Sequence, residues 1–110
     1  MDAPQINKSI QDSVDELDTL IHAPARLKLM TMLYVVDSMD YVFLKNQSGY
    51  SWGNLSTHIN KLEEAGYLSI EKGYRGRKPN TTLQLTAAGR EAFRSYRSSM
   101  QQILDDLPEG

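Results

Sequence analysis

The chain has no cysteine, one tryptophan, two phenylalanines and four prolines among its 110 residues. The absence of cysteine excludes disulfide bonds and thiolate metal sites, and it fits a reducing compartment. No apolar run approaches ~18 residues, so the sequence predicts no membrane span. The first residues lack a basic segment followed by an apolar one, so we expect no signal peptide. These absences favour a cytoplasmic protein with a single modest core.

Charge is distributed unevenly along the chain. The formal net charge of −2 would by itself argue weakly against a nucleic-acid-binding protein. Residues 1–23, however, carry five acids and one lysine, residues 45–97 carry nine bases and four acids, and residues 98–110 carry three acids. Because local potential decides where a polyanion docks, the basic middle of the chain is the candidate surface for nucleic acid.

Apolar residues recur every three or four positions near both ends, which predicts two amphipathic helices. The first covers roughly 5–21, with Asp2 and Gln5 as a capping box. The second covers 87–107, with Thr86 as its N-cap. The apolar positions are Ile6, Ile10, Val14, Leu17 and Ile21 in the first helix, and Ala92, Phe93, Tyr96, Met100, Ile103, Leu104 and Leu107 in the second.

A third helix, expected to begin near Pro24 and to run to Val36, is apolar on almost every face, which is typical of a central, buried helix. A short helix over 41–48 and a turn at Gly49 follow it. The next helix begins after Ser51 as N-cap and stops at Gly66. Its inward positions are Leu55, Ile59 and Leu62.

Two alternating segments, 67–72 and 81–86, predict an antiparallel pair of strands. In that pair Leu68 and Ile70 would face Leu83 and Leu85. The residues between them, 73–80, contain two glycines and a proline and read as a projecting hairpin tip. The predicted order is helix, helix, short helix, turn, helix, basic hairpin and last helix. This is the order of an α+β winged helix-turn-helix. We expect one domain over 1–110, with its core at 24–86.

The helix after Ser51 is the candidate recognition helix, because a helix that enters the major groove needs an outward face that is small and polar. Asparagine can pair with adenine edges, lysine with phosphate or guanine, and a helix N-terminus with phosphate. A solvated helix face is the alternative reading. The candidate DNA-binding residues on this helix are Ser51, Gly53, Asn54, Thr57, His58, Asn60 and Lys61.

The hairpin adds four cations within seven residues and no acid among them: Lys72, Arg75, Arg77 and Lys78. Arginine on a projecting tip can enter a narrow, negative minor groove. A hairpin that is merely kept soluble by charge would more often mix the two signs. The hairpin is therefore the second candidate DNA-binding element.

Three segments of the sequence resemble those of a known family: GNLSTHINKLEEAGYL (53–68), GRKP (76–79) and LTAAGREAF (85–93). In order and spacing they are similar to the winged-helix DNA-binding domains of MarR/ArsR-like transcriptional regulators, over about residues 22–107. The resemblance implies a homodimeric repressor or activator, with 51–64 in the major groove and 73–80 in the minor groove. Without cysteine or a paired-histidine site, the metal sensing of the ArsR branch is not implied.

The terminal helices are the expected dimer interface. A helix of about 20 residues is roughly 30 Å long and reaches beyond what the core can cover. Its apolar stripe would then need a partner, and a two-fold pair presents two recognition helices to a palindromic site. The interface residues predicted are Ile6, Ile10, Val14, Leu17, Tyr96, Met100, Ile103, Leu104 and Leu107.

Two other classes of function compete with this prediction. A winged helix that serves only protein assembly would more often expose apolar groups at the recognition helix and the hairpin. Gly49–Gly53 matches the G-x-S-x-G nucleophile elbow, but only His58 follows nearby and no acid lies between, so we expect no enzyme. His22 and His58 lack the spacing of metal ligands. We therefore expect no cofactor, no metal and no membrane partner, and the sequence specifies no small-molecule effector.

Overall fold

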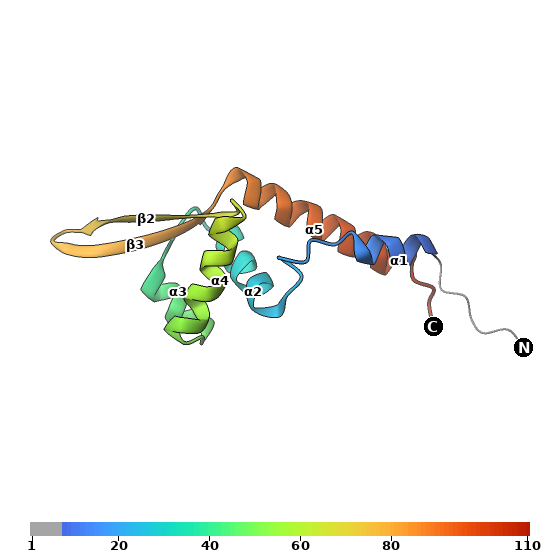
Figure 1. The fold of residues 1–110 in the computed structure, drawn as a ribbon, viewed down its shortest axis with the longest axis horizontal. Helices are drawn as coiled ribbons and strands as arrows, with labels where there is room; N and C mark the ends of the chain where they lie inside the picture. The colour runs from blue at the N-terminus through green and yellow to red at the C-terminus, as the bar shows by residue number, and fades with distance from the viewer. Residues whose placement is uncertain (1–7) are drawn as a thin grey trace, which may run out of the picture.

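The computed structural model describes residues 8–110, and these form five helices and one three-stranded sheet in an elongated winged helix-turn-helix (Figure 1). The bounds are α1 (Lys8–Asp15), α2 (Pro24–Tyr34), β1 (Met39–Asp40), α3 (Tyr41–Ser48), α4 (Trp52–Glu64), β2 (Leu68–Arg75), β3 (Lys78–Leu85) and α5 (Ala87–Asp106). The β2–β3 hairpin, here called the wing, projects at one end of the molecule, while α1 and α5 lie side by side at the other. The predicted α+β class is confirmed.

The core lies where α2, α3 and α4 meet the sheet. The predicted inward face of α4, Leu55, Ile59 and Leu62, is fully buried. It packs in one cluster with α2 and the sheet, to which Leu29 and Leu83 belong. Burying a leucine or isoleucine side chain contributes roughly 1.5–3 kcal/mol, so this cluster fixes the position of α4. Among residues 8–110, no helix has both the length and the apolarity needed to cross a bilayer.

The wing differs from the predicted hairpin in the length of its strands. The expected pairs Leu68–Leu85 and Ile70–Leu83 are present, but the ladder continues to the pair Arg75–Lys78. Only residues 76 and 77 remain as the turn, so 73–80 is mostly strand and not a loop. Gly76 has φ +65°, as the first central residue of a type II′ turn requires, and this tight turn lets pairing extend to the tip.

The N-terminal helix is shorter than the predicted 5–21. Within the described residues it ends at Asp15, and the chain then crosses to α2 in turns. The carboxylate of Asp18 accepts hydrogen bonds from the backbone N–H groups of Leu20 and Ile21, which gives the chain an alternative to the helix. Leu17 and Ile21 still reach the core, but from this non-helical segment. Asp2, Gln5 and Ile6 lie outside the described residues.

The central helix begins at Pro24 as predicted but ends at Tyr34, two residues before Val36. The guanidinium of Arg90, on α5, donates to the backbone oxygens of Tyr34 at 3.0 Å and Val36 at 2.7 Å. A cation that satisfies the last carbonyls of a helix stabilises its C-terminus. The chain then enters β1, which was not predicted and which pairs with β3 at the sheet edge.

Candidate nucleic-acid interface

The turn between α3 and α4 places the start of α4 at the surface. Ser51 is the N-cap, as predicted, and its Oγ accepts a hydrogen bond from the backbone N–H of Asn54 at 3.2 Å. The run Gly49–Gly53 is therefore a helix-turn-helix turn with a capping serine, and not a strand followed by a nucleophile elbow. The cap leaves the first N–H groups of α4 directed toward any anion that approaches the helix end.

The outward face of α4 is exposed along its length. Gly53, Asn54, Thr57, Asn60 and Lys61 are all exposed. The hydroxyl of Thr57 donates to the backbone oxygen of Gly53 at 2.9 Å, so its methyl group and oxygen lone pairs remain for a partner. Since phosphate oxygens only accept hydrogen bonds, this arrangement favours a thymine methyl over a phosphate as the contact of Thr57.

His58 lies on the flank of α4 that faces α2. Nη1 of Arg26 lies 3.2 Å from His58 Nδ1, and Nε of Arg26 donates to the backbone oxygen of Leu20 at 2.6 Å. Burial lowers the pKa of His58, and the charges of Arg26 and Lys61 lower it further. The ring is therefore neutral at pH 7, with Nδ1 accepting from Arg26 and the proton on Nε2.

Lys28 on α2 stabilises the turn between α3 and α4. Its Nζ donates to the backbone oxygen of Ser48 at 2.7 Å and lies 4.9 Å from the centre of the Tyr50 ring. This role of Lys28 could not be predicted from the sequence, because Lys28 and Ser48 are 20 positions apart. The available signal was a lysine within a mainly apolar helix. Arg26 thus links α2 to α4, and Lys28 links α2 to the end of α3.

The four cations of the wing are exposed, and within residues 8–110 none of them has a hydrogen-bond or ion-pair partner. Side chains alternate between the two faces of a strand, so Arg75 and its cross-strand partner Lys78 point to the face opposite Lys72. Arg77 lies in the turn itself. The wing thus carries positive charge on both faces and at its tip, rather than in a single row.

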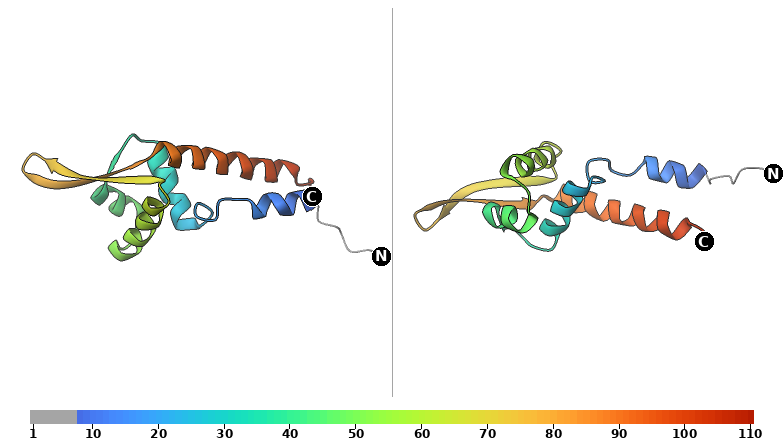
Figure 2. Two further views of the ribbon diagram at one scale, coloured as in Figure 1. Left: turned by 45° about the horizontal axis from the view of Figure 1, so that its top comes forward. Right: turned by 90° about the horizontal axis from the view of Figure 1, so that it is seen from below.

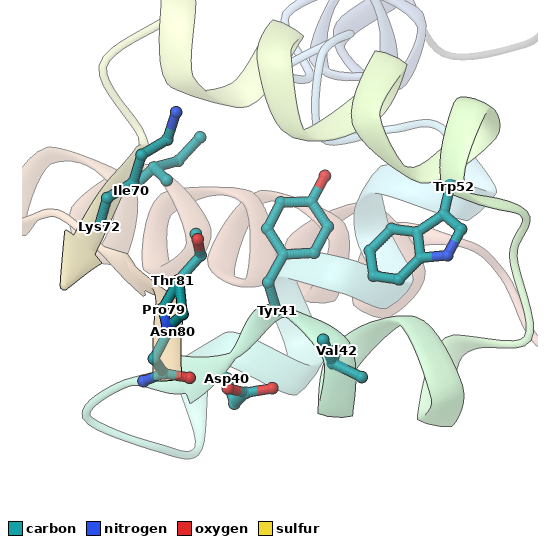
Figure 3. Close-up of a pocket in the computed structure, with 9 residues that line it drawn as sticks. All are labelled: Asp40, Tyr41, Val42, Trp52, Ile70, Lys72, Pro79, Asn80 and Thr81. Carbon is teal, nitrogen blue, oxygen red and sulfur yellow. The ribbon is translucent and has the colours of Figure 1, made fainter. Parts of the chain in front are cut away.

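A groove of about 430 Å³ separates the start of α4 from the wing (Figure 3). Trp52 forms one wall, Lys72 and the adjoining strand residues form the other, and Tyr41 lies between them. The rings of Tyr41 and Trp52 are 5.6 Å apart, and Nζ of Lys45 lies 5.7 Å from the centre of the indole. No motif or periodicity in the sequence predicts a role for Trp52, although a tryptophan beside a helix N-cap is an unusual choice for a solvated position.

Burial divides the predicted dimer residues into two groups. Leu17, Tyr96 and Ile103 lie in the core of the chain itself, so they have little surface left for a partner. The exposed or half-buried apolar residues at the end of the molecule opposite the wing are Ile10, Val14, Met100, Leu104 and Leu107. There α1 runs alongside the distal half of α5, as Figure 2 shows from two further directions. We call this pair of helices the stem.

The chain is similar to known proteins both in sequence and in fold. The profile of the winged helix DNA-binding domain family matches residues 25–104. The chain belongs to this family. As in other winged helix domains, the matched segment contains both the helix-turn-helix and the wing. An uncharacterized protein of Methanocaldococcus jannaschii is 29% identical to it over 88 residues, which is 80% of this chain and 96% of that protein.

Solved structures of transcriptional regulators share the fold of this winged helix domain. A transcriptional regulator homologue from Pyrococcus horikoshii superposes with a TM-score of 0.79 at 24% identity, covering 92% of this chain and all of that one. A putative MarR-family regulator from Enterococcus faecalis gives 0.69 at 19% identity, over 93% and 90% of the two chains. A variant of MarR from E. coli, complexed with operator DNA, gives 0.61 at 16% identity, over 92% and 81%. The overall fold is that of MarR-family regulators.

Proposed function

We propose that this protein is a transcriptional regulator that binds double-stranded DNA sequence-specifically as a homodimer. The observation that carries the proposal is the exposed polar face of α4 beside a wing whose four cations have no partner within residues 8–110. Both elements belong to the segment that matches the winged helix DNA-binding domain family.

In this proposal α4 enters the major groove. Asn54 and Asn60 are exposed and lie in the first and third turns of the helix, so each can pair with an adenine edge. Lys61 follows on the same face. The exposed N-terminus of α4, capped by Ser51, supplies backbone N–H groups to a flanking phosphate.

The wing reaches the adjacent minor groove. It projects well beyond the helices, so its tip can follow the duplex while α4 stays in the major groove (Figure 1). Lys72, Arg75 and Lys78 supply phosphate contacts on its two faces, and Arg77 in the turn is the side chain placed to enter the minor groove.

The stem supplies the homodimer. Val14, Leu104 and Leu107 are about half exposed, and Met100 and Ile10 are partly buried against the core. Two such stems, related by a two-fold axis, would cover each other's apolar stripes and present two copies of α4 to a palindromic site. The solved MarR variant with operator DNA supports this proposal by analogy of fold.

Selection of bound fragments from fragmented genomic DNA tests the proposal directly. Purified protein should enrich fragments that share an inverted repeat, with half-site centres about one helical turn apart or a multiple of it. Fluorescence anisotropy on the enriched and on mixed-sequence duplexes then gives the specificity ratio, expected to be about 10³ or more. Recovery of fragments without any shared sequence would contradict specific regulation.

One observation favours a second candidate, a winged helix that assembles with another protein. Val42, Phe43 and Trp52 on and beside α3, and Tyr74 on the wing, are exposed apolar side chains. Exposed apolar patches often mark protein interfaces. If no duplex is bound at low salt, this assembly function replaces the regulator.

A further inference from the structure

The groove between α4 and the wing lies between the two proposed DNA-binding elements, and of its lining residues only Lys72 belongs to the contacts proposed above. We infer that it holds one sugar–phosphate strand of bound DNA, with the indole of Trp52 packed against a deoxyribose. The inference rests on the proposed function, because it needs α4 in the major groove and the wing in the adjacent minor groove.

Position is the first argument. The major and minor grooves of a duplex are separated by one sugar–phosphate strand, so a protein that enters both must straddle that strand. The surface between the two entering elements then faces the strand. In this chain that surface is the groove between Trp52 and Lys72, as Figure 3 shows.

The exposure of Trp52 is the second argument. Trp52 is the first residue of α4 and lies between Ser51 and Gly53 in the sequence. Its exposed fraction is 51%. Gly53 does not shield it, because glycine has no side chain and nothing lies within 4 Å of where a Cβ of Gly53 would stand. Covering a half-exposed indole with an apolar surface is favourable in free energy, and the faces of deoxyribose offer such a surface.

The indole is also held in place. Tyr41 and Lys45 lie one turn apart on α3, with the Tyr41 ring 5.6 Å from the indole ring and Lys45 Nζ 5.7 Å from its centre. A preorganised ring loses little conformational entropy on binding. Most of the free energy gained by burying the ring would therefore contribute to the affinity. An aromatic residue that merely filled space would need no such bracing at a half-exposed site.

The charges around the groove fit a polyanion at its rim. Lys72 lines the wall formed by the wing, and Lys45 lies at the opposite side beside the indole. Asn80 and Thr81 add polar side chains between them. Asp40 also lines the groove, but its carboxylate already accepts the backbone N–H of Phe43 at 3.0 Å as the cap of α3. Phosphates would therefore lie toward the two lysines and away from Asp40.

Tyr41 completes the lining. Burial raises its pKa, so its hydroxyl remains protonated at neutral pH and can donate to a phosphate oxygen. Sugar and phosphate contacts carry no sequence information, so this groove should contribute equally to binding of operator and of unrelated DNA.

Because Trp52 is the only tryptophan in the chain, its fluorescence reports on this groove alone. The probe is a mixed-sequence duplex of about three helical turns at low salt, and anisotropy of a dye on the DNA measures binding independently of the indole. We expect quenching by acrylamide to fall at least about threefold once the duplex is bound, because the strand covers the ring.

Three outcomes separate the claims. A bound duplex with reduced quenching supports the inference. A bound duplex with unchanged quenching overturns it and leaves the proposed function intact, and the groove would then be open to a small aromatic molecule instead. The absence of any binding by anisotropy overturns the proposed function, and the inference with it.

A substitution gives a second, independent test. Trp52→Ala should weaken binding to the mixed-sequence duplex roughly tenfold, with no change in the salt dependence, because no charge is lost. Phe43→Ala is the matched control, since Phe43 is 52% exposed on the neighbouring α3 but does not line this groove. Thermal unfolding should show both variants folded. Equal affinities for the two variants would overturn the inference.

Discussion

The hydroxyl of Tyr67 donates a 2.6 Å hydrogen bond to Oδ2 of Asp18 and so ties the start of the wing to the segment between α1 and α2. The other carboxylate oxygen of Asp18 accepts the N–H groups of Leu20 and Ile21. One carboxylate therefore shapes the connection between the stem and the winged helix and anchors it to the sheet.

This pair predicts a loss of stability in strong alkali. The hydrogen bond to Asp18, followed by burial and the charge of Asp18, raises the pKa of Tyr67 from 10.0 to about 12. A pKa that is raised on folding stabilises the protein fully below the unfolded value of 10.0, and that contribution is lost as pH rises through about 12. Urea unfolding of wild type and Tyr67→Phe measures it. Their difference in unfolding free energy should be constant below about pH 10 and shrink between about pH 10 and 12. A constant difference across that range would contradict the assignment.

Gly89 should tolerate no side chain. It lies in the first turn of α5 beside the backbone of Tyr67, and a Cβ there would stand 2.0 Å from the carbonyl oxygen of Tyr67. The obstacle is backbone, which cannot move aside as a flexible side chain could, so Gly89→Ala should destabilise the fold by about 1–3 kcal/mol or more. Gly53→Ala is the matched control. Its helical site is open, and the free energy of unfolding should rise by about 1 kcal/mol. Denaturant unfolding of both variants checks the contrast.

The elements that could be predicted from the sequence are those whose signals are local. Ser51 and Thr86 cap α4 and α5 as expected, because a cap and the first turn it satisfies lie within four residues of each other. The inward face of α4 follows in the same way from the spacing of Leu55, Ile59 and Leu62.

The elements that could not be predicted depend on distant partners. Leu17 and Ile21 keep a helical spacing, yet the turn at Asp18 and the bond from Tyr67, 49 positions away, hold them in a non-helical segment. The end of α2 is likewise set by Arg90, more than 50 positions later. The groove beside Trp52 is lined by the starts of α3 and α4 and by both strands of the wing, which no local sequence pattern brings together.

The stem should form a homodimer in solution. Light scattering of the DNA-free protein at micromolar concentration should give about twice the chain mass of 12.5 kDa. Leu104→Glu places a charge in the exposed apolar stripe, so it should shift the mass toward the monomer. Ser98→Glu puts the same charge on the opposite, exposed face of α5 and should leave the dimer intact. A wild-type mass near the chain mass of 12.5 kDa would exclude the dimer.

Asn54 should carry sequence preference. Its side chain is exposed while its backbone N–H bonds to Ser51, so Asn54→Ala keeps the cap and the core. We expect a loss of about 1–3 kcal/mol on the selected operator and much less on mixed-sequence DNA. Gln84→Ala, which removes an exposed amide from β3, is the control and should change neither affinity. Equal losses on both DNAs would mean that Asn54 contacts only phosphate.

Arg77 should supply affinity that does not depend on sequence. It lies in the two-residue turn of the wing, exposed and without a partner in the described part of the chain, so its substitution should not disturb the fold. Each phosphate contact releases counterions, and the logarithm of affinity therefore falls with the logarithm of salt concentration. A symmetric dimer loses two contacts per substitution, so Arg77→Ala should weaken binding to operator and mixed-sequence DNA together and flatten the salt slope by up to about two units.

Arg94→Ala is the matched control, because Arg94 lies on α5 in an ion pair with Glu91, away from the wing. Insertion of Arg77 into the minor groove would add a preference for A·T-rich flanks, and the variant would lose it. Affinity measured by anisotropy across a salt series decides the matter. If wild type and Arg77→Ala have the same slope, Arg77 does not contact the DNA, and this result counts against the proposed docking of α4 and wing together.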